Sequence, residues 1–157
     1  MDRWSHMRHK LEEDYLAPCL RGRVRYFVTR YVGTHDYEGR AAILVDDEEV
    51  LSGGYFEAWP RDLLFGSETR EEIRRNYYEG LNVYDFYCAF HEFDTQTVQE
   101  SLQSDDQIVR LFALLDRRVG RRTLQKLRDE VAAQPPAFQR LYDIRMRAEG
   151  LDPQQAI

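Results

Sequence analysis

Hydrophobic and polar residues alternate most clearly over residues 23–51. Val24, Tyr26 and Val28 fall on one face of a predicted strand. The opposite face collects arginine, aromatic and threonine side chains, namely Arg23, Arg25, Phe27, Thr29 and Tyr31. The next segment, residues 40–45, is apolar on both faces, which is typical of a central strand. The pattern predicts a three- to four-stranded antiparallel meander.

Helical periodicity replaces this alternation on both sides of the sheet. Trp4, Met7, Leu11 and Tyr15 recur at intervals of three or four residues, so they form one apolar stripe of a predicted N-terminal helix. After the sheet, the aromatic-rich segment 82–93 fits both a strand and a helical period, and we interpret it as a helix. A C-terminal run of four to five helices is expected to pack on the sheet.

Polar residues and glycines predict where these helices begin and end. Asp94 or Thr95 is expected to cap a short helix. Ser104 is expected to cap a longer one, whose apolar stripe reaches Val119. Gly120 follows this stripe and is expected to end the helix as its C-terminal cap.

Strands that precede a segregated set of helices argue for an α+β fold. With 157 residues the chain is expected to form a single domain, residues 1–157. Its predicted parts are a helix over residues 1–17, an antiparallel sheet over 23–59, a helical part over 67–150 and a tail over 151–157.

Composition narrows the class of protein. A hydrophobic fraction of 43% is enough for a packed core, and a net charge of −6 argues against binding nucleic acid over a large surface. Cys19 and Cys88 are far apart and are interpreted as buried free thiols in a reducing compartment. The charged N-terminus lacks a signal-peptide pattern and no apolar run is long enough to cross a bilayer, so we expect a cytoplasmic protein without a membrane partner.

Arginines gather where two predicted helices meet: Arg117, Arg118, Arg121 and Arg122. They are candidates for an anion-binding corner, since the free N–H groups of the second helix add a positive field there. Such a corner suits an acidic protein surface, or nucleic acid read by a helix–turn–helix. The alternative is that the arginines complement the end of the first helix and pair with neighbouring acids such as Asp116.

The strand face with Arg23, Arg25, Phe27 and Tyr31 is a second candidate surface. Arginine and aromatic side chains interleaved on an open sheet bind single-stranded nucleic acid or a protein partner. The same pattern occurs where a chain's own helices cover the sheet, and both interpretations stay open.

Two polar segments would supply acid–base or metal chemistry if the fold brought them together. His35 and Asp36 lie between the first two predicted strands, and His91 and Asp94 lie near the end of the aromatic-rich segment. Their convergence would indicate a small metal-dependent hydrolase or nuclease. The sequence has no self-sufficient catalytic or cofactor motif, so no catalytic residue, metal or cofactor is assigned.

The chain resembles a family of short bacterial cytoplasmic proteins, known by the locus tag of one member, in three stretches: WSHMRHKLEE; LRGRVRYFVTRY with HDYEGRAAILVDDEEVL; and IVRLFALLDRRVGRRTLQKL with RMRAEGL. That family has no assigned activity, so the resemblance implies no functional residues. We expect a non-enzymatic protein-binding module, such as an accessory or immunity-like component of a bacterial system, because tyrosine and arginine are enriched at protein interfaces. Nucleic-acid binding and metal-dependent hydrolysis are the alternatives.

Overall fold

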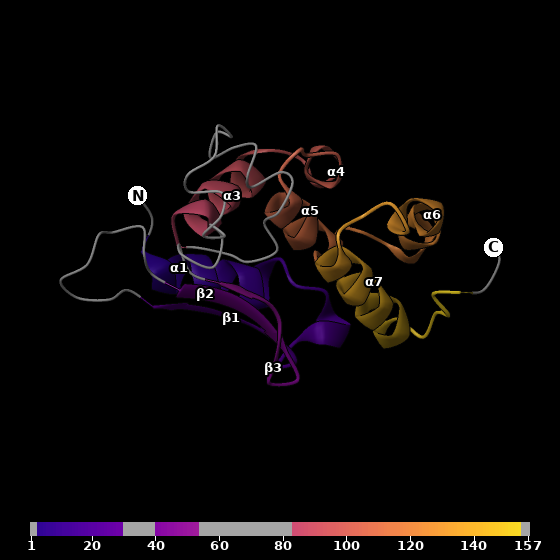
Figure 1. Ribbon diagram of the computed structural model, residues 1–157, viewed down its shortest axis with the longest axis horizontal. Coiled ribbons are helices and arrows are strands. Elements are labelled where there is room, and N and C mark those ends of the chain that lie inside the picture. Colours follow the sequence, from indigo (N-terminus) through magenta and orange to yellow (C-terminus); the bar gives the residue numbers. More distant parts are fainter. Residues whose placement is uncertain (1–2, 30–39, 54–82, 155–157) are drawn as a thin grey trace, which may run out of the picture.

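The computed structural model describes residues 3–29, 40–53 and 83–154, in which helices lie on one face of an antiparallel sheet (Figure 1). Before the sheet come α1 (Trp4–His9), the π-helix η1 (Lys10–Asp14) and the 3-10 helix η2 (Pro18–Leu20). The strands are β1 (Val24–Thr29), β2 (Arg40–Val45) and β3 (Glu48–Gly53). The later helices are α3 (Val83–Thr95), α4 (Val98–Leu102), α5 (Gln107–Leu114), α6 (Arg121–Val131) and α7 (Pro136–Ala148). The predicted α+β class is confirmed.

β2 lies at the centre of the sheet, as its two apolar faces predicted, with β1 and β3 on either side. β1 and β2 run antiparallel, with Val24 opposite Val45. Asp46 and Asp47 join β2 to β3 and have positive φ angles of 51° and 68°. Positive φ at both central residues is the geometry of a two-residue turn whose twist matches that of the flanking strands. The acidic tip is therefore a tight hairpin.

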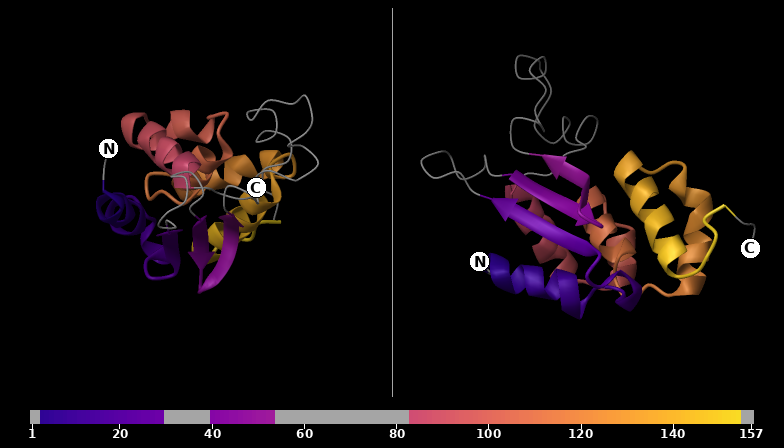
Figure 2. Two further views of the ribbon diagram at one scale, coloured as in Figure 1. Left: turned by 60° about the vertical axis from the view of Figure 1, so that its left-hand side comes forward. Right: turned by 90° about the horizontal axis from the view of Figure 1, so that it is seen from below.

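Alternation along β1 separates core side chains from outer ones. Val24 and Tyr26 are buried, whereas Arg25 and Phe27 lie on the opposite face and Phe27 is 43% exposed. Figure 2 shows α3 and α5 behind the sheet in the view from below. The chain's described helices therefore cover the face of Tyr26 and leave Arg25 exposed.

Aromatic rings join the sheet to these helices. Tyr26 of β1 contacts Phe86 of α3 and Phe112 of α5, with ring centroids 5.9 and 5.8 Å apart. Phe86 and Phe112 also meet edge to face at 5.3 Å. Each such pair contributes about 0.5–1.5 kcal/mol beyond the burial of its area. Residues 83–93 of the aromatic-rich segment, which fitted two periods, are confirmed as part of a helix, and residue 82 lies outside the described residues.

The predicted cap of α4 is wrong. Asp94 and Thr95 form the last turn of α3, and Thr97 caps α4 by accepting a hydrogen bond from the backbone N–H of Glu100 at 3.1 Å. Thr95 does not cap α4, because its hydroxyl donates back to the carbonyl of His91 within α3 at 2.9 Å. Helix α3 therefore continues through both Asp94 and Thr95.

The boundaries predicted around α5 are also wrong. Asp106, not Ser104, is the N-cap, and its carboxylate accepts from the backbone N–H of Ile108 at 2.9 Å. The helix ends at Leu114, and Gly120, with φ of −85°, is the N-cap of α6 rather than the end of α5. An irregular connection therefore separates the two helices.

The two cysteines have different surroundings. Cys19 is partly buried and donates its thiol to Glu149 at 3.2 Å. Burial, with that carboxylate beside it, raises the pKa of the Cys19 thiol. Cys88 is exposed, so its interpretation as a buried thiol is wrong. Its position on the outer face of α3 follows from the helical period, which turns Phe86 and Phe90 to the core.

Candidate functional site

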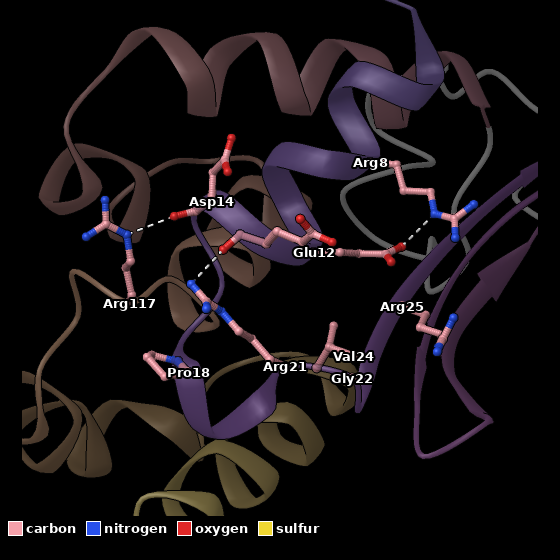
Figure 3. A pocket seen from close by; sticks show the side chains of 10 residues that line it. Arg8, Glu12, Asp14, Pro18, Arg21, Gly22, Val24, Arg25 and Arg117 are labelled. Atoms are coloured by element: carbon pink, nitrogen blue, oxygen red, sulfur yellow. Dashed lines mark hydrogen bonds and ion pairs between the residues drawn. The ribbon is translucent and has the colours of Figure 1, made fainter.

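An open groove of about 1060 Å³ runs between the N-terminal helical segment and the start of β1 (Figure 3). Its lining is strongly charged, with Arg8, Arg21, Arg25 and Arg117, the acids Glu12, Glu13 and Asp14, and also Pro18, Gly22 and Val24. Arg25 comes from the predicted sheet surface and Arg117 from the predicted helix junction. The fold brings one member of each candidate surface into the same groove.

Two of these arginines cap the end of η1. Arg21 donates from Nη2 to the carbonyl of Glu13 at 3.3 Å, and Arg117 donates from Nε to the carbonyl of Asp14 at 2.8 Å. Carbonyl groups in the last turn of a helix lack intrahelical partners, so guanidinium donors stabilise them. A guanidinium carries five N–H donors, and these two bonds leave most of them to face the groove.

Backbone pairing fixes the position of Arg117. The N–H of Arg117 donates to the carbonyl of Tyr15 at 2.7 Å, and the N–H of Ala17 donates to the carbonyl of Leu115 at 2.9 Å. The two segments thus form a short antiparallel bridge. Because the backbone itself is held, the Arg117 guanidinium is placed before any ligand arrives.

Glu12 connects the helical wall of the groove to the sheet. One carboxylate oxygen accepts from Nε of Arg8 at 3.1 Å and from the backbone N–H of Tyr26 at 3.0 Å. The Glu12 side chain is 16% exposed, so these bonds are partly shielded from water. Arg8 and Glu12 are four residues apart, the spacing at which side chains meet on one helix face. Glu12 therefore occupies the free edge of β1 at Tyr26.

Arg25 is the least engaged of the four groove arginines. Its side chain is exposed, and within residues 3–29, 40–53 and 83–154 it forms no hydrogen bond or ion pair. Figure 3 shows its guanidinium on the side of the groove formed by the sheet. Within those ranges, all of its guanidinium donors are free for a ligand from solution.

Comparison with known proteins places the chain in a family. The model of the SF0329 protein family matches residues 3–146 of 157. The chain belongs to this family. No curated protein and no solved structure matches it. The locus-style designation agrees with the resemblance found in the sequence. Across the described ranges of the SF0329 chain, no helix is both long and apolar enough to cross a membrane.

Two other predicted arginines of the SF0329 chain are engaged internally. Arg23 binds Asp46 through Nε and Nη2 at 3.0 and 2.9 Å, and this guanidinium lowers the pKa of the Asp46 carboxyl. Arg118 binds the buried Asp116 through Nε and Nη2 at 3.0 and 2.8 Å and lies 5.0 Å from the Tyr15 ring centroid. Their role in binding stays a prediction.

Arg121 and Arg122 lie in the first turn of α6 and are exposed. Neither side chain has a hydrogen bond or ion pair with another residue in the described part of the chain, and neither lines the groove. Cations at a helix N-terminus oppose the helix dipole, so helix stability does not account for them. Among the four junction arginines, only Arg117 belongs to the groove.

The structure describes two of the four candidate acid–base residues, His91 and Asp94. Tyr31, His35 and Asp36 fall outside the described residues, so whether His35 and Asp36 approach His91 is not tested. His91 is exposed, and Asp94 is bound by Lys10 at 3.2 Å. The described ranges contain no group of three or more side chains placed to hold a metal ion.

Tyr15 and Asp94 form a polar pair beside the core. The Tyr15 hydroxyl donates to Asp94 at 2.5 Å. Burial and this carboxylate raise the pKa of Tyr15 to about 12. For Asp94, burial acts in the opposite direction, but hydrogen bonds from Tyr15 and Lys10 lower its pKa overall. The pair holds η1 against α3 and is engaged internally.

The structural arginine Arg145 had a weak signal in the sequence. It sits on the apolar stripe of α7, three residues after Tyr142, where an arginine is unusual. Its guanidinium is buried and donates to the carbonyls of Leu114, Asp116 and Val119 at 2.8, 3.0 and 2.7 Å. It thereby shapes the connection that carries Arg117.

Two of the four groove arginines, Arg8 and Arg21, were not predicted as site residues. The sequence around each one does contain a pattern: Arg8 precedes Glu12 by four residues, and Arg21 adjoins the turn at Gly22. Neither signal distinguishes a binding arginine from a surface arginine.

Proposed function

We propose that this SF0329 protein is a non-enzymatic protein-binding module of the bacterial cytoplasm, and that its groove arginines hold an acidic surface of the partner. The proposal is carried by one observation: Arg25 and Arg117, far apart in sequence, line one open groove together with Arg8 and Arg21. The family resemblance supports the bacterial setting.

Arginine suits this role for physical reasons. Its planar guanidinium binds a carboxylate through two parallel hydrogen bonds, and such charge-assisted pairs are stronger than neutral ones. Single ion pairs at a flat exposed surface contribute little. In this groove the guanidiniums of Arg21 and Arg117 are already anchored to backbone carbonyls, so less side-chain freedom is lost on binding.

The acids of the groove favour a protein partner over nucleic acid. Glu12, Glu13 and Asp14 lie among the arginines, and a continuous phosphate backbone would pass close to these carboxylates. An acidic protein segment carries separate negative groups that can be spaced to meet the arginines and avoid the carboxylates. The net charge of −6 points the same way.

Quantitative affinity capture with matched variants tests the proposal. Arg25→Glu reverses the charge of a groove arginine whose side chain has no bond to lose among the described residues. Arg122→Glu is the control, because Arg122 is also exposed and lies outside the groove. We expect a protein that is enriched by the wild-type chain and by Arg122→Glu after nuclease treatment, and lost with Arg25→Glu.

Two results would overturn the proposal. If every captured protein were retained equally by Arg25→Glu and Arg122→Glu, the groove would not be the contact surface. If capture depended on intact nucleic acid, and binding fell steeply with salt, the nucleic-acid alternative would replace it. Circular dichroism of both variants checks that they remain folded.

A further inference from the structure

The connection between β2 and β3 forms an acidic tip, which we define as the four consecutive exposed acids Asp46, Asp47, Glu48 and Glu49. In Figure 1 this hairpin projects at the lower end of the molecule, beyond the ends of the helices. Asp46 binds Arg23 at 2.9 Å, and Glu48 binds Arg140 at 3.2 Å. The Asp47 side chain, by contrast, forms no hydrogen bond or ion pair within the described ranges. The tip therefore presents an uncompensated carboxylate to solvent.

Hairpin stability does not account for the charge at Asp47. Its φ angle of 68° is one that glycine adopts without the steric cost that a Cβ brings. Neighbouring carboxylates in the tip also repel one another. An uncharged turn residue would thus make the hairpin more stable. A residue that costs stability in an exposed turn points to a role outside the chain's own packing.

The acidic tip lies directly beside the groove. The backbone N–H of Asp46 donates to the carbonyl of Arg23 at 2.9 Å, and the two side chains are also paired. Gly22 and Val24, the chain neighbours of Arg23, both line the groove. No residue of the tip belongs to that lining. The tip and the groove are therefore adjacent patches on one surface of the molecule.

The groove and the tip carry unbalanced charges of opposite sign. Three groove arginines form no ion pair in the described part of the chain, namely Arg21, Arg25 and Arg117. Two of them are anchored to backbone carbonyls, which do not neutralise their charge. The groove acids Glu13 and Asp14 lie instead next to His9, at 3.2 and 3.5 Å. The positive charge of the groove is thus available to an external carboxylate.

We infer that the acidic tip of a second copy of this chain occupies the groove in the free protein, with Asp47 of each copy beside Arg25 of the other. A two-fold interface repeats the same contact twice, so it requires both complementary patches in one surface. The adjacent tip and groove meet this requirement. An acidic segment far from the groove would form only one such contact. The result is a closed dimer whose two grooves are both filled.

This dimer regulates the groove, and in that respect the inference rests on the proposed function. An acidic partner and the tip of the second copy would compete for the same arginines. Exposed ion pairs are weak, so the dimer should dissociate readily and a partner with several carboxylates should displace the tip. Self-association would then shield the groove from weakly bound acidic ligands.

Sedimentation equilibrium of the purified full chain tests the self-association. We expect a monomer–dimer equilibrium that shifts toward monomer at high salt, because salt screens exposed charges. Asp47→Asn removes the charge and keeps a residue that tolerates a positive φ. It should raise the dissociation constant about tenfold, since the contact is lost twice. Asp129→Asn, at an exposed acid of α6 outside the tip and the groove, is the matched control and should not change it.

A charge exchange tests the contact between Asp47 and Arg25. Arg25→Glu and Asp47→Arg each place like charges opposite one another and should both weaken the dimer. The double variant Arg25→Glu/Asp47→Arg restores opposite charges at both contacts, so it should recover most of the association. Circular dichroism checks that each variant is folded. A double variant as weak as its two parents would show that these residues do not meet.

The inference would be overturned by a chain that is monomeric at low salt, or by dimers of equal strength in Asp47→Asn and Asp129→Asn. Either result would leave the proposed function standing. Asp47→Asn keeps every groove arginine and should still capture the partner, at least as well as the wild type. If the dimer behaved as expected but no protein were captured through the groove, the proposed function alone would fail.

Discussion

Replacing Arg145 by methionine tests whether one buried guanidinium holds the connection between α5 and α6. Arg145 is 2% exposed and donates to the carbonyls of Leu114, Asp116 and Val119 and to the carboxylate of Glu149. Methionine occupies the apolar part of the site but donates no hydrogen bond. Three carbonyls and the partly buried carboxylate of Glu149 would then each lose one donor.

The expected loss of stability is large. Removing one partner of a buried ion pair costs about 3–5 kcal/mol, because the remaining charge keeps its desolvation penalty. We take about 4 kcal/mol for Arg145→Met. In a chain of 157 residues, a loss of that size lowers the thermal midpoint by about 12 °C.

Thermal and urea denaturation, followed by circular dichroism, measure this loss. The control is Arg147→Met on the same helix, because Arg147 is 65% exposed and has one bond, to Asp143 at 2.8 Å. That variant should leave the midpoint nearly unchanged. If the two variants unfolded at the same temperature, Arg145 would not hold the connection. Arg145→Met should also weaken capture by the groove, since Arg117 lies on this connection.

Three further changes test separate parts of the structure. Asp47→Gly should raise the free energy of unfolding in urea by about 0.5 kcal/mol, because glycine relieves a positive φ in the hairpin turn; a lower stability would contradict the turn geometry. Gly22→Ala should lower it by about 1 kcal/mol in the same assay, because φ is 79° and an added Cβ would meet no atom within 4 Å, so any loss reports the backbone alone. Tyr15→Phe should cost about 1 kcal/mol at neutral pH, a value already reduced for the partly exposed site. The lowered pKa of Asp94 predicts that this difference shrinks as pH falls below about 3.8, and the raised pKa of Tyr15 predicts that it shrinks as pH rises from 10 toward about 12. A difference that is constant from acid to alkaline pH would show that the two side chains are not coupled.

The sheet was predictable because its signals are local. Alternation in β1 and the doubly apolar segment 40–45 depend on which neighbours each residue has along the strand, so the sequence contains the information directly. The helix ends were less predictable. Gly120 follows an apolar stripe, but the connection before it is held by Arg145 on α7, a contact that no local pattern reports.

The candidate site also has a part that local patterns predicted and a part that depends on distant contacts. Arg25 and Arg117 were each found from local arginine patterns, but their meeting in one groove depends on the backbone bridge between Tyr15 and Arg117. Arg118 belonged to the same arginine pattern, yet its buried partner Asp116 engages it internally. Sequence patterns located arginines, and only the fold separated those that face a groove from those that hold the chain together.

The bond between Arg117 and the carbonyl of Asp14 joins residues 103 positions apart. Bringing such distant segments together lowers chain entropy before any contact compensates, which slows folding. During translation, the end of the amino-terminal helical segment would therefore lack this guanidinium cap until the ribosome had released the stretch around Arg117. Its apolar stripe, which packs on Phe86 and Phe93, would be open to chaperones until that segment emerged. A chain cut short before Arg117 would leave the carbonyl of Asp14 without this donor.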